Sequence, residues 1–276
     1  MRIWISVDME GIAGVSRGAE TAPFQPGWER SCRLMTAEVN AAVEGALEGG
    51  AQEIVVNDGH WHGNNLLLEE LNPVVEVVGG HGRALAMAEG MGPNFDAAFF
   101  VGYHASAGTQ DAVLDHTYAD PAQVMEVRLN GRPQSEGSLN AYVCGAFDCP
   151  LALFTGDSAA VSQMHDFCLE IEGVVVKEAA GRESAQALHP VAAQERIRTG
   201  ARRALERLSS IPALVPPDQR SNFEVDFQSV ALADSCLRVP GVRRLGSRTV
   251  AFGSSDYLEA FRLFLALVDL AGSAAG

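Results

Sequence analysis

Residues 2–11 read RIWISVDMEG, a short apolar run that stops at two acidic residues separated by a single methionine. The run RIWISV (2–7) has the apolar, β-rich composition of a buried strand. Side chains alternate between the two faces of an extended chain, so Asp8 and Glu10 point the same way. The stretch therefore predicts a core strand that presents two carboxylates together where it ends.

Further strand-like runs alternate with helix-like runs along the next two hundred residues. The predicted strands are 2–7, 53–57, 74–78, 97–103, 151–156 and 174–178, and the predicted helices are 28–48, about 136–147, 158–171 and about 190–208. Gly49 and Gly50 form a natural stop for the first long helix. Alternation of buried strands and amphipathic helices predicts an α/β fold, a mainly parallel sheet with helices on both faces.

Two segments depart from this alternation. VMEVRLNGRP (124–133) is typical of a hairpin, with Asn130 and Gly131 in its tight turn. The proline-rich, polar stretch 209–222 predicts a connection to a smaller unit, which would hold strands at 222–227 and 249–252 and helices at 229–237 and 254–271. We therefore expect an α/β metal-binding catalytic domain over 1–215 and a smaller C-terminal α+β unit over 216–276.

The composition is that of a globular, acidic protein. Of 276 residues, 47% are hydrophobic and 20% are charged, and 35 acidic residues against 20 basic ones give a formal charge of −15. Such a balance repels phosphate backbones and anionic membrane surfaces. We expect neither nucleic acid nor membrane as a partner.

Cysteine usage and hydropathy favour a cytoplasmic location. The five cysteines are odd in number and show no CxxC spacing, which suits reduced thiols better than disulfides or structural zinc. The first apolar run is too short for a secretory signal, and the apolar stretch FRLFLALVDLA near the end is interrupted by charge.

Candidate ligands collect where the predicted strands end. The ends of three strands carry Asp8, Glu10, His60, His62 and His104. In open α/β sheets, ligands bind at the carboxyl ends of the strands. Carboxylates with imidazoles are zinc-type ligands, whereas calcium prefers oxygen alone, and so many ligands would allow two metals bridged by one carboxylate. One such residue alone is usually an ordinary loop residue, so the hypothesis of a metal site rests on their convergence.

The motifs SVDMEG (6–11), VNDGH (56–60) and GYHA (102–105) resemble those of the zinc-dependent D-aminopeptidases found in bacterial dipeptide-transport operons, peptidase family M55. Further matches, in order along the chain up to about residue 190, are NNL (64–66), NGRP (130–133), E-x-x-L-N-A-Y from Glu136, TGD (155–157) and K-x4-R-x-S-A from Lys177. The ordered set is specific, whereas each motif alone is weak.

The resemblance implies two zinc ions per subunit, with Asp8 bridging them. The remaining ligands it implies are Glu10, His60, His104 and Glu136. Taken alone, Glu136 would be interpreted as an ordinary acid at a helix N-terminus. His62 falls where the family does not require histidine, so we expect it beside the site or on the surface.

The resemblance also assigns a catalytic role to His116 in LDHT (114–117), although the loop from His104 to His116 is one residue longer than the family pattern. Its near-neutral intrinsic pKa suits a general base, a general acid or a group that stabilises an oxyanion, and the sequence does not choose among them.

The function implied is hydrolytic removal of the N-terminal residue from short peptides, with a preference for D-residues that only the family suggests. The family also implies a ring-shaped homo-oligomer, a decamer, that encloses its active sites. Another metallohydrolase, such as an amidase or a phosphoesterase, and a non-enzymatic peptide-binding protein are the alternatives. Zinc, manganese and cobalt all accept this set of ligands.

Three polar residues outside the ligand set stay open between roles. Asp157 either holds a substrate amine or is a hydrogen-bonded loop aspartate. Lys177 and Arg182 contact a substrate carboxylate or a neighbouring subunit, or form ordinary salt bridges.

Overall fold

The computed structural model describes residues 1–119, 123–216 and 220–274, and its larger sheet has seven strands in the order β3-β2-β1-β4-β7-β8-β9. All neighbours pair in parallel except β9, which runs antiparallel to β8. The strands are β1 (Arg2–Val7), β2 (Glu53–Asp58), β3 (Val75–Val78), β4 (Ala97–Tyr103), β7 (Leu151–Asp157), β8 (Glu172–Gly181) and β9 (Ser184–Ala187). The predicted mainly parallel sheet is therefore confirmed.

Strand β1 lies inside this sheet, between β2 and β4. Its Ile5 is in register with Val56 on one side and with Phe99 on the other. The chain runs outward from β1 to β2 and β3 and then returns to the opposite side of β1 as β4. A reversal of this kind opens a crevice at the carboxyl ends of the two strands that flank it, here β1 and β4.

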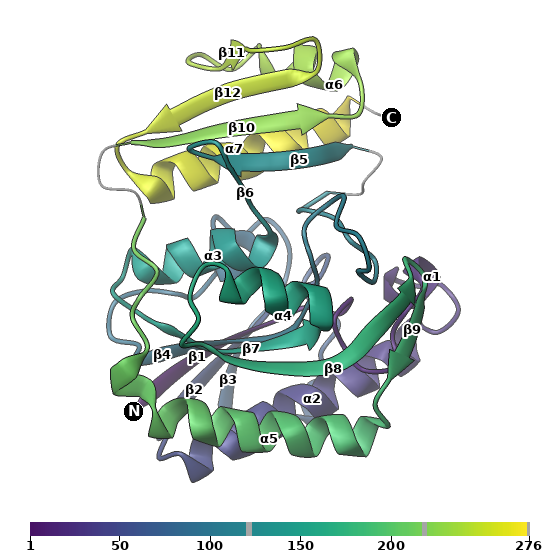
Figure 1. Cartoon of the computed structure of the whole chain (residues 1–276), viewed down its shortest axis with the longest axis vertical. Coiled ribbons are helices and arrows are strands. Elements are labelled where there is room, and N and C mark those ends of the chain that lie inside the picture. Colours follow the sequence, from purple (N-terminus) through teal and green to yellow (C-terminus); the bar gives the residue numbers. More distant parts are fainter. Residues whose placement is uncertain (120–122, 217–219, 275–276) are drawn as a thin grey trace.

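Helices cover both faces of the sheet, as Figure 1 shows. Helices α2 (Trp28–Glu48) and α5 (Pro190–Glu206) pack against each other on one face, and α3 (Glu136–Gly145) and α4 (Ser158–His165) lie on the other, with the short α1 (Gly18–Thr21) near the β8–β9 end. The predicted helix 158–171 is too long at its C-terminal end. Helix α4 ends at His165 because the chain must turn back to enter β8, whose Glu172 pairs with Leu153.

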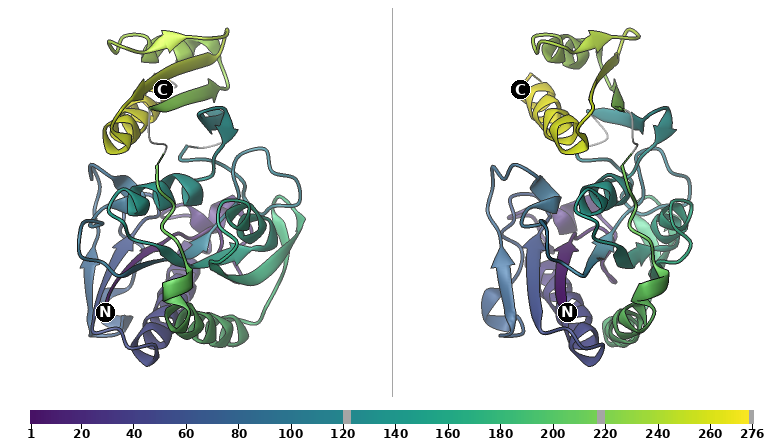
Figure 2. Two further views of the ribbon diagram at one scale, coloured as in Figure 1. Left: turned by 60° about the vertical axis from the view of Figure 1, so that its left-hand side comes forward. Right: turned by 90° about the vertical axis from the view of Figure 1, so that its left-hand side faces the viewer.

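A second, five-stranded antiparallel sheet has the order β11-β12-β10-β5-β6. It consists of β5 (Val124–Leu129), β6 (Arg132–Pro133), β10 (Ser221–Phe227), β11 (Arg243–Arg244) and β12 (Thr249–Ser254), packed with α6 (Val230–Cys236) and α7 (Tyr257–Ser273). Figure 2 shows this sheet stacked above the larger one along the long axis of the molecule.

The predicted hairpin at 124–133 is confirmed, and it belongs to the second sheet. Its turn residues Asn130 and Gly131 have φ angles of 50° and 80°, the left-handed values that a tight hairpin turn requires. Strand β5 pairs with β10, with Val127 opposite Val225. The second sheet thus draws on residues from both sides of the proposed boundary near residue 215, and that boundary stays a prediction.

Helix α3 lies between the two sheets, and all ten of its residues are buried. It contacts β4 and β7 on one side and α7 on the other, and the Tyr257 hydroxyl donates to the Leu139 carbonyl at 2.7 Å. Two residues separate the helix from β6, and the second of them, Ser135, caps the helix: its side chain accepts from the Ser138 N–H at 3.1 Å. The β5–β6 hairpin therefore determines where the first residue of α3, Glu136, is placed.

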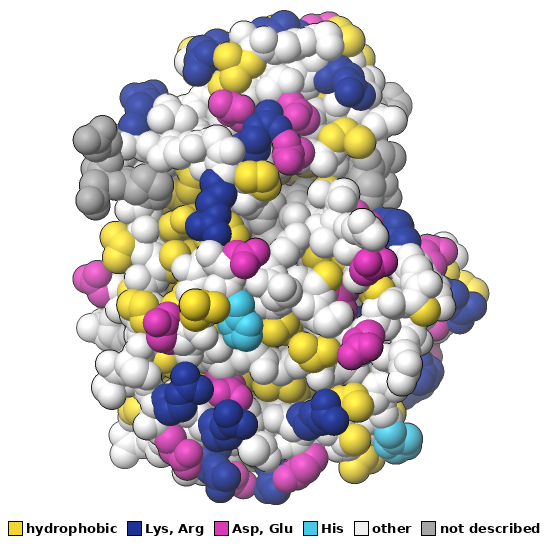
Figure 3. Space-filling view, in the orientation of Figure 1, with side chains coloured by type: hydrophobic (Ala, Val, Ile, Leu, Met, Phe, Trp, Pro, Cys, Tyr) yellow, Lys and Arg dark blue, Asp and Glu magenta, His cyan; other side chains and the backbone are white. Residues whose placement is uncertain are grey.

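The charged side chains on the surface and the state of the cysteines are those that the sequence leads us to expect. Acidic and basic side chains are intermixed on the face in Figure 3. All five cysteines are buried free thiols. Among the described residues, no helix is both long and apolar enough to cross a membrane.

Gly102 is a position at which the approach of β1 to β4 depends on glycine. Its φ is +71°, and an added Cβ would lie 2.3 Å from the Asp8 carbonyl oxygen, whereas Gly131 has a φ of +80° and nothing within 4 Å. We expect Gly131→Ala to cost about 1 kcal/mol of backbone strain. Gly102→Ala should cost about 1–3 kcal/mol more, because it adds overpacking to the same strain.

Urea unfolding of the two variants and the wild-type protein measures both losses. Equal losses of stability for Gly102→Ala and Gly131→Ala would mean that the two strand ends do not approach as closely as described.

Candidate metal centre

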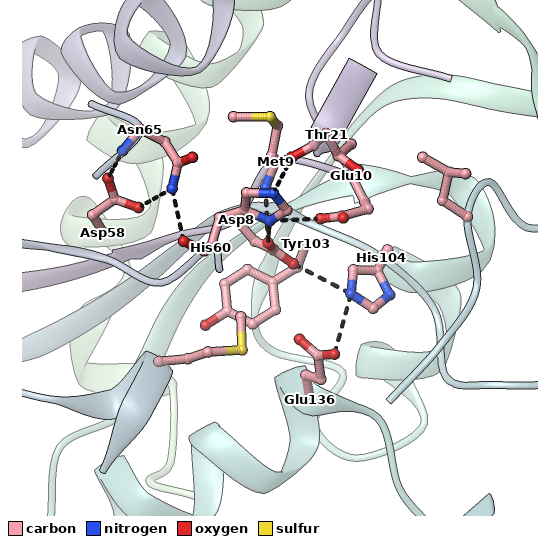
Figure 4. A network of polar contacts seen from close by, with 12 residues as sticks. Asp8, Met9, Glu10, Thr21, Asp58, His60, Asn65, Tyr103, His104 and Glu136 are labelled. Atoms are coloured by element: carbon pink, nitrogen blue, oxygen red, sulfur yellow. Dashed lines mark hydrogen bonds and ion pairs between the residues drawn. The ribbon is translucent and has the colours of Figure 1, made fainter. Parts of the chain in front are cut away.

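The five predicted metal ligands lie together at the carboxyl edge of the larger sheet, and Figure 4 shows them facing one another. They come from the end of β1 (Asp8, Glu10), the end of β2 (His60), the end of β4 (His104) and the first residue of α3 (Glu136). All five side chains are buried. We call these five residues the ligand cluster; that they bind metal stays a prediction.

The Asp8 carboxylate divides the ligand cluster into two halves. Its Oδ1 lies 3.0 Å from His60 Nδ1, and its Oδ2 lies 3.3 Å from His104 Nε2. Glu10 Oε2 is 3.1 Å from the same His60 nitrogen. Glu136 Oε1 is 3.4 Å from the same His104 nitrogen. Each half thus consists of one Asp8 oxygen, one imidazole nitrogen and one glutamate.

Backbone carbonyls hold the outer nitrogen of each imidazole. His60 Nε2 donates to the Thr21 carbonyl at 2.8 Å, and His104 Nδ1 donates to the Ala105 carbonyl at 2.9 Å. In the neutral tautomer that these bonds favour, the inner nitrogen carries a lone pair and no proton. This orientation by the second nitrogen is the usual arrangement of metal-binding histidines.

Several inner atoms of the ligand cluster have no hydrogen-bond partner. Asp8 Oδ2, Glu10 Oε2 and His104 Nε2 are all buried without one. Buried acceptors without a donor are costly, and a cation placed among them would remove that cost. Carboxylate oxygens mixed with imidazole nitrogens fit zinc and similar divalent ions, and the donor set therefore fits the metal that the family implies.

The electrostatics of the ligand cluster also favour positive charge. Burial opposes the ionisation of Asp8, yet the adjacent His104 and His60 imidazoles hold the pKa of that carboxyl well below its usual range. Burial likewise opposes a charge on the histidines, but Glu10 raises the pKa of His60, and Glu136 raises that of His104, well above the ordinary imidazole value. The acids therefore stay ionised and attract either protons or metal ions.

His116 lies at the margin of the ligand cluster. Its ring stacks on that of His104, with centroids 3.9 Å apart and planes at 10°, and its Nε2 lies 3.6 Å from Glu136 Oε1. Its Nδ1 donates to the Leu114 carbonyl at 2.8 Å. The His116 side chain is 20% exposed, whereas that of His104 is 1% exposed. A molecule that approaches from solvent can therefore reach His116.

The loop that carries His116 is held by two of the residues whose roles the sequence left open. Asp157 is buried, caps α4 by accepting from the Ala160 N–H, and also accepts from the Val113 N–H, both at 2.8 Å. Arg182 pairs with Asp115 through an Nε–Oδ1 contact of 2.8 Å. In this structure both side chains are used to shape the loop.

The turn that presents His60 depends on a pair of residues that the sequence did not reveal. The Asn65 side chain donates to Asp58 Oδ1 at 2.9 Å and to the His60 carbonyl at 2.7 Å (Figure 4). In the sequence, Asn65 stands out only as part of the NNL motif (64–66). An aspartate at a strand end seven residues before an asparagine was the only available signal, and it is a weak one.

His62 lies outside the ligand cluster, as expected. It is exposed, and its Nδ1 lies 3.2 Å from His81 Nδ1 on the loop after β3. Within the described residues, the groups of three potential ligands with donor atoms within 4.8 Å of one another are Asp8, Glu10, His104 and His104, His116, Glu136. Both groups belong to the site described above.

Comparison with known proteins agrees with this geometry. The family model described as D-aminopeptidase, peptidase family M55, matches residues 1–266. A D-aminopeptidase from Bacillus subtilis (strain 168) is 32% identical over 272 residues, which cover 98% of each chain. The solved structure of the zinc-dependent D-aminopeptidase DppA from Bacillus subtilis, a self-compartmentalizing protease, superposes with a TM-score of 0.96 and 31% identity over 100% of both chains. The chain therefore belongs to peptidase family M55, the D-aminopeptidases.

Proposed function

We propose that this protein is a zinc-dependent aminopeptidase that removes the N-terminal residue from short peptides with the help of two metal ions. As a member of its family it is a hydrolase of peptide bonds, and a relative of the same fold, DppA from Bacillus subtilis, depends on zinc. The observation that carries the proposal is the single Asp8 carboxylate, whose two oxygens face two histidines that backbone carbonyls orient.

In the proposed arrangement Asp8 would be a ligand shared by the two ions. Glu10 and His60 complete one half of the site, and His104 and Glu136 complete the other. When bound, zinc supplies Lewis acidity and lowers the pKa of water toward neutrality. The protein contributes the spacing of the ligands and a buried environment that strengthens every charge interaction.

His116 is proposed as the group that moves a proton during the reaction. It is partly exposed and stacked on a ligand, and its outer nitrogen is held by the Leu114 carbonyl, so its Nε2 faces the place where substrate would lie. A neutral imidazole there accepts a proton, and an imidazolium returns one to a leaving amine.

We further propose a cytoplasmic homo-oligomer, a ring-shaped decamer, that takes short D-residue peptides. The support is the self-compartmentalizing relative, which matches over the full length of the chain, together with unusually exposed aromatic side chains, of which Phe24 is 90% and Trp61 56% exposed. Exposed apolar side chains mark contact surfaces where they join into a continuous patch. Sedimentation should give a mass near ten times the 29.3 kDa of one chain.

Metal analysis of the purified protein should find two zinc ions per chain. Asp8→Ala should lose both ions, because it removes the shared ligand, while His60→Ala should lose one. His62→Ala is the matched control, because this exposed histidine lies two residues from His60 and outside the ligand cluster. If Asp8→Ala kept two ions with unchanged affinity, Asp8 would not be a bridging ligand.

His116→Ala should keep both ions and lower kcat by about 10²- to 10⁴-fold, the usual contribution of a positioned acid or base. Metal content and steady-state kinetics should be measured on the same preparation. Loss of an ion would make His116 a ligand, and full activity would remove it from the reaction.

A substrate panel tests the reaction itself. Paired dipeptides that begin with a D- or an L-residue, the same dipeptides with a blocked N-terminus, simple amides and phosphate esters should be compared with the zinc-loaded protein. We expect turnover of free-amine peptides and a preference for the D-residue. Hydrolysis of phosphate esters or blocked substrates without hydrolysis of free dipeptides would identify a different metallohydrolase.

A further inference from the structure

Lys177 is the only lysine in the chain, in which the other 19 basic residues are arginines. It lies in β8 and is 2% exposed, among the largest fully buried side chains of the protein. A buried ammonium group is tolerated only when its donors are satisfied. Because arginine is used at every other such position, the lysine indicates that position 177 specifically requires an ammonium group.

The Lys177 ammonium group donates to three backbone carbonyls in one short segment, residues 10–15, between β1 and α1. Its Nζ contacts the carbonyl oxygen of Glu10, lies 3.0 Å from that of Ile12 and lies 2.6 Å from that of Val15. Three donors on one atom meet three converging acceptors, a match that the planar fork of arginine cannot reproduce. The segment is thereby tied to a strand more than 160 positions away in the chain.

This segment carries Glu10, one of the proposed ligands. Two further backbone contacts hold it: the Gly11 N–H donates to the Gly102 carbonyl at 2.7 Å, and the Ala13 N–H donates to Glu38 Oε1 at 2.8 Å. Lys177 binds the Glu10 carbonyl and not its carboxylate, so the carboxylate stays directed at His60. Without the ammonium, the Glu10 and Val15 carbonyls would lose this donor and the Ile12 carbonyl would keep only the Val15 N–H, so the segment would have to move.

We propose that Lys177 is the positioning residue of the Glu10 half of the metal site, and that its contact with segment 10–15 is coupled to metal binding. The inference rests on the proposed function, because it requires that Glu10 bind an ion. If the Lys177 contact favours the geometry that binds metal, then bound metal must stabilise the contact by the same free energy. A lysine that only stabilised the fold would show no such coupling.

The single lysine makes this coupling measurable in the unmodified protein. A water-soluble acetylating reagent, followed by peptide mass spectrometry, reports on one side-chain amine. We expect Lys177 to be acetylated about 10-fold more slowly in zinc-loaded protein than in chelator-treated protein, within the usual range of such couplings. The α-amine at the start of the chain serves as the internal reference and should react at the same rate in both samples.

Buried thiols distinguish local opening from global unfolding in the same experiment. Cys144 in α3 and Cys236 in α6 are fully buried and lie outside segment 10–15. Their alkylation should stay slow in both samples if only the segment loosens. Equal acetylation of Lys177 with two zinc ions bound and with none would overturn the inference, whereas a protein that binds no zinc would instead refute the proposed function.

Variants supply a second measurement. Lys177→Met and Lys177→Arg should both weaken the binding of one of the two ions by about 10-fold or more, and excess zinc should restore kcat/KM. Val176→Ala is the matched control, because Val176 is a fully buried neighbour on β8, and its truncation should lower stability without changing zinc affinity. Two ions bound with unchanged affinity by Lys177→Met would also overturn the inference.

Discussion

The structure depends on one carboxylate shared between two histidines. Asp8 faces His60 with one oxygen and His104 with the other, and both histidines are locked from behind by backbone carbonyls. Rotation of the Asp8 carboxylate or flipping of either imidazole ring would cost free energy, because each would break a buried hydrogen bond. The rest of the centre is arranged around this bridge.

The larger sheet makes the bridge possible. The strand order reverses beside β1, so the ends of β1, β2 and β4 lie next to one another. Gly102 lets β4 approach the Asp8 backbone closely, and Lys177 draws the segment after β1 onto β8. Three strand ends and one buried ammonium thus hold in place a group of acids that repel one another.

The second sheet also helps to position the ligand cluster, although none of its described strands contributes a residue to it. Its β5–β6 hairpin leads directly into α3, and α7 packs on the far side of that helix. Glu136 is therefore placed by a hairpin that pairs with β10, about 90 residues later in the chain. The two sheets therefore have different roles, since one presents four residues of the ligand cluster and the other positions the fifth.

The sequence by itself determined the class of the fold and much of the centre. Strand periodicity predicted the parallel sheet, and the rule that ligands lie at strand ends brought Asp8, Glu10, His60 and His104 together, because both depend on local pattern. Glu136 came only from the family resemblance, since a glutamate at a helix start carries no local sign of convergence. Only the tertiary structure decided that β5 joins β10, that Asn65 braces the His60 turn and that Lys177 holds segment 10–15. Each is a contact between residues brought together by chain reversal, and the energies of such contacts depend on burial and direction, which a linear pattern does not contain.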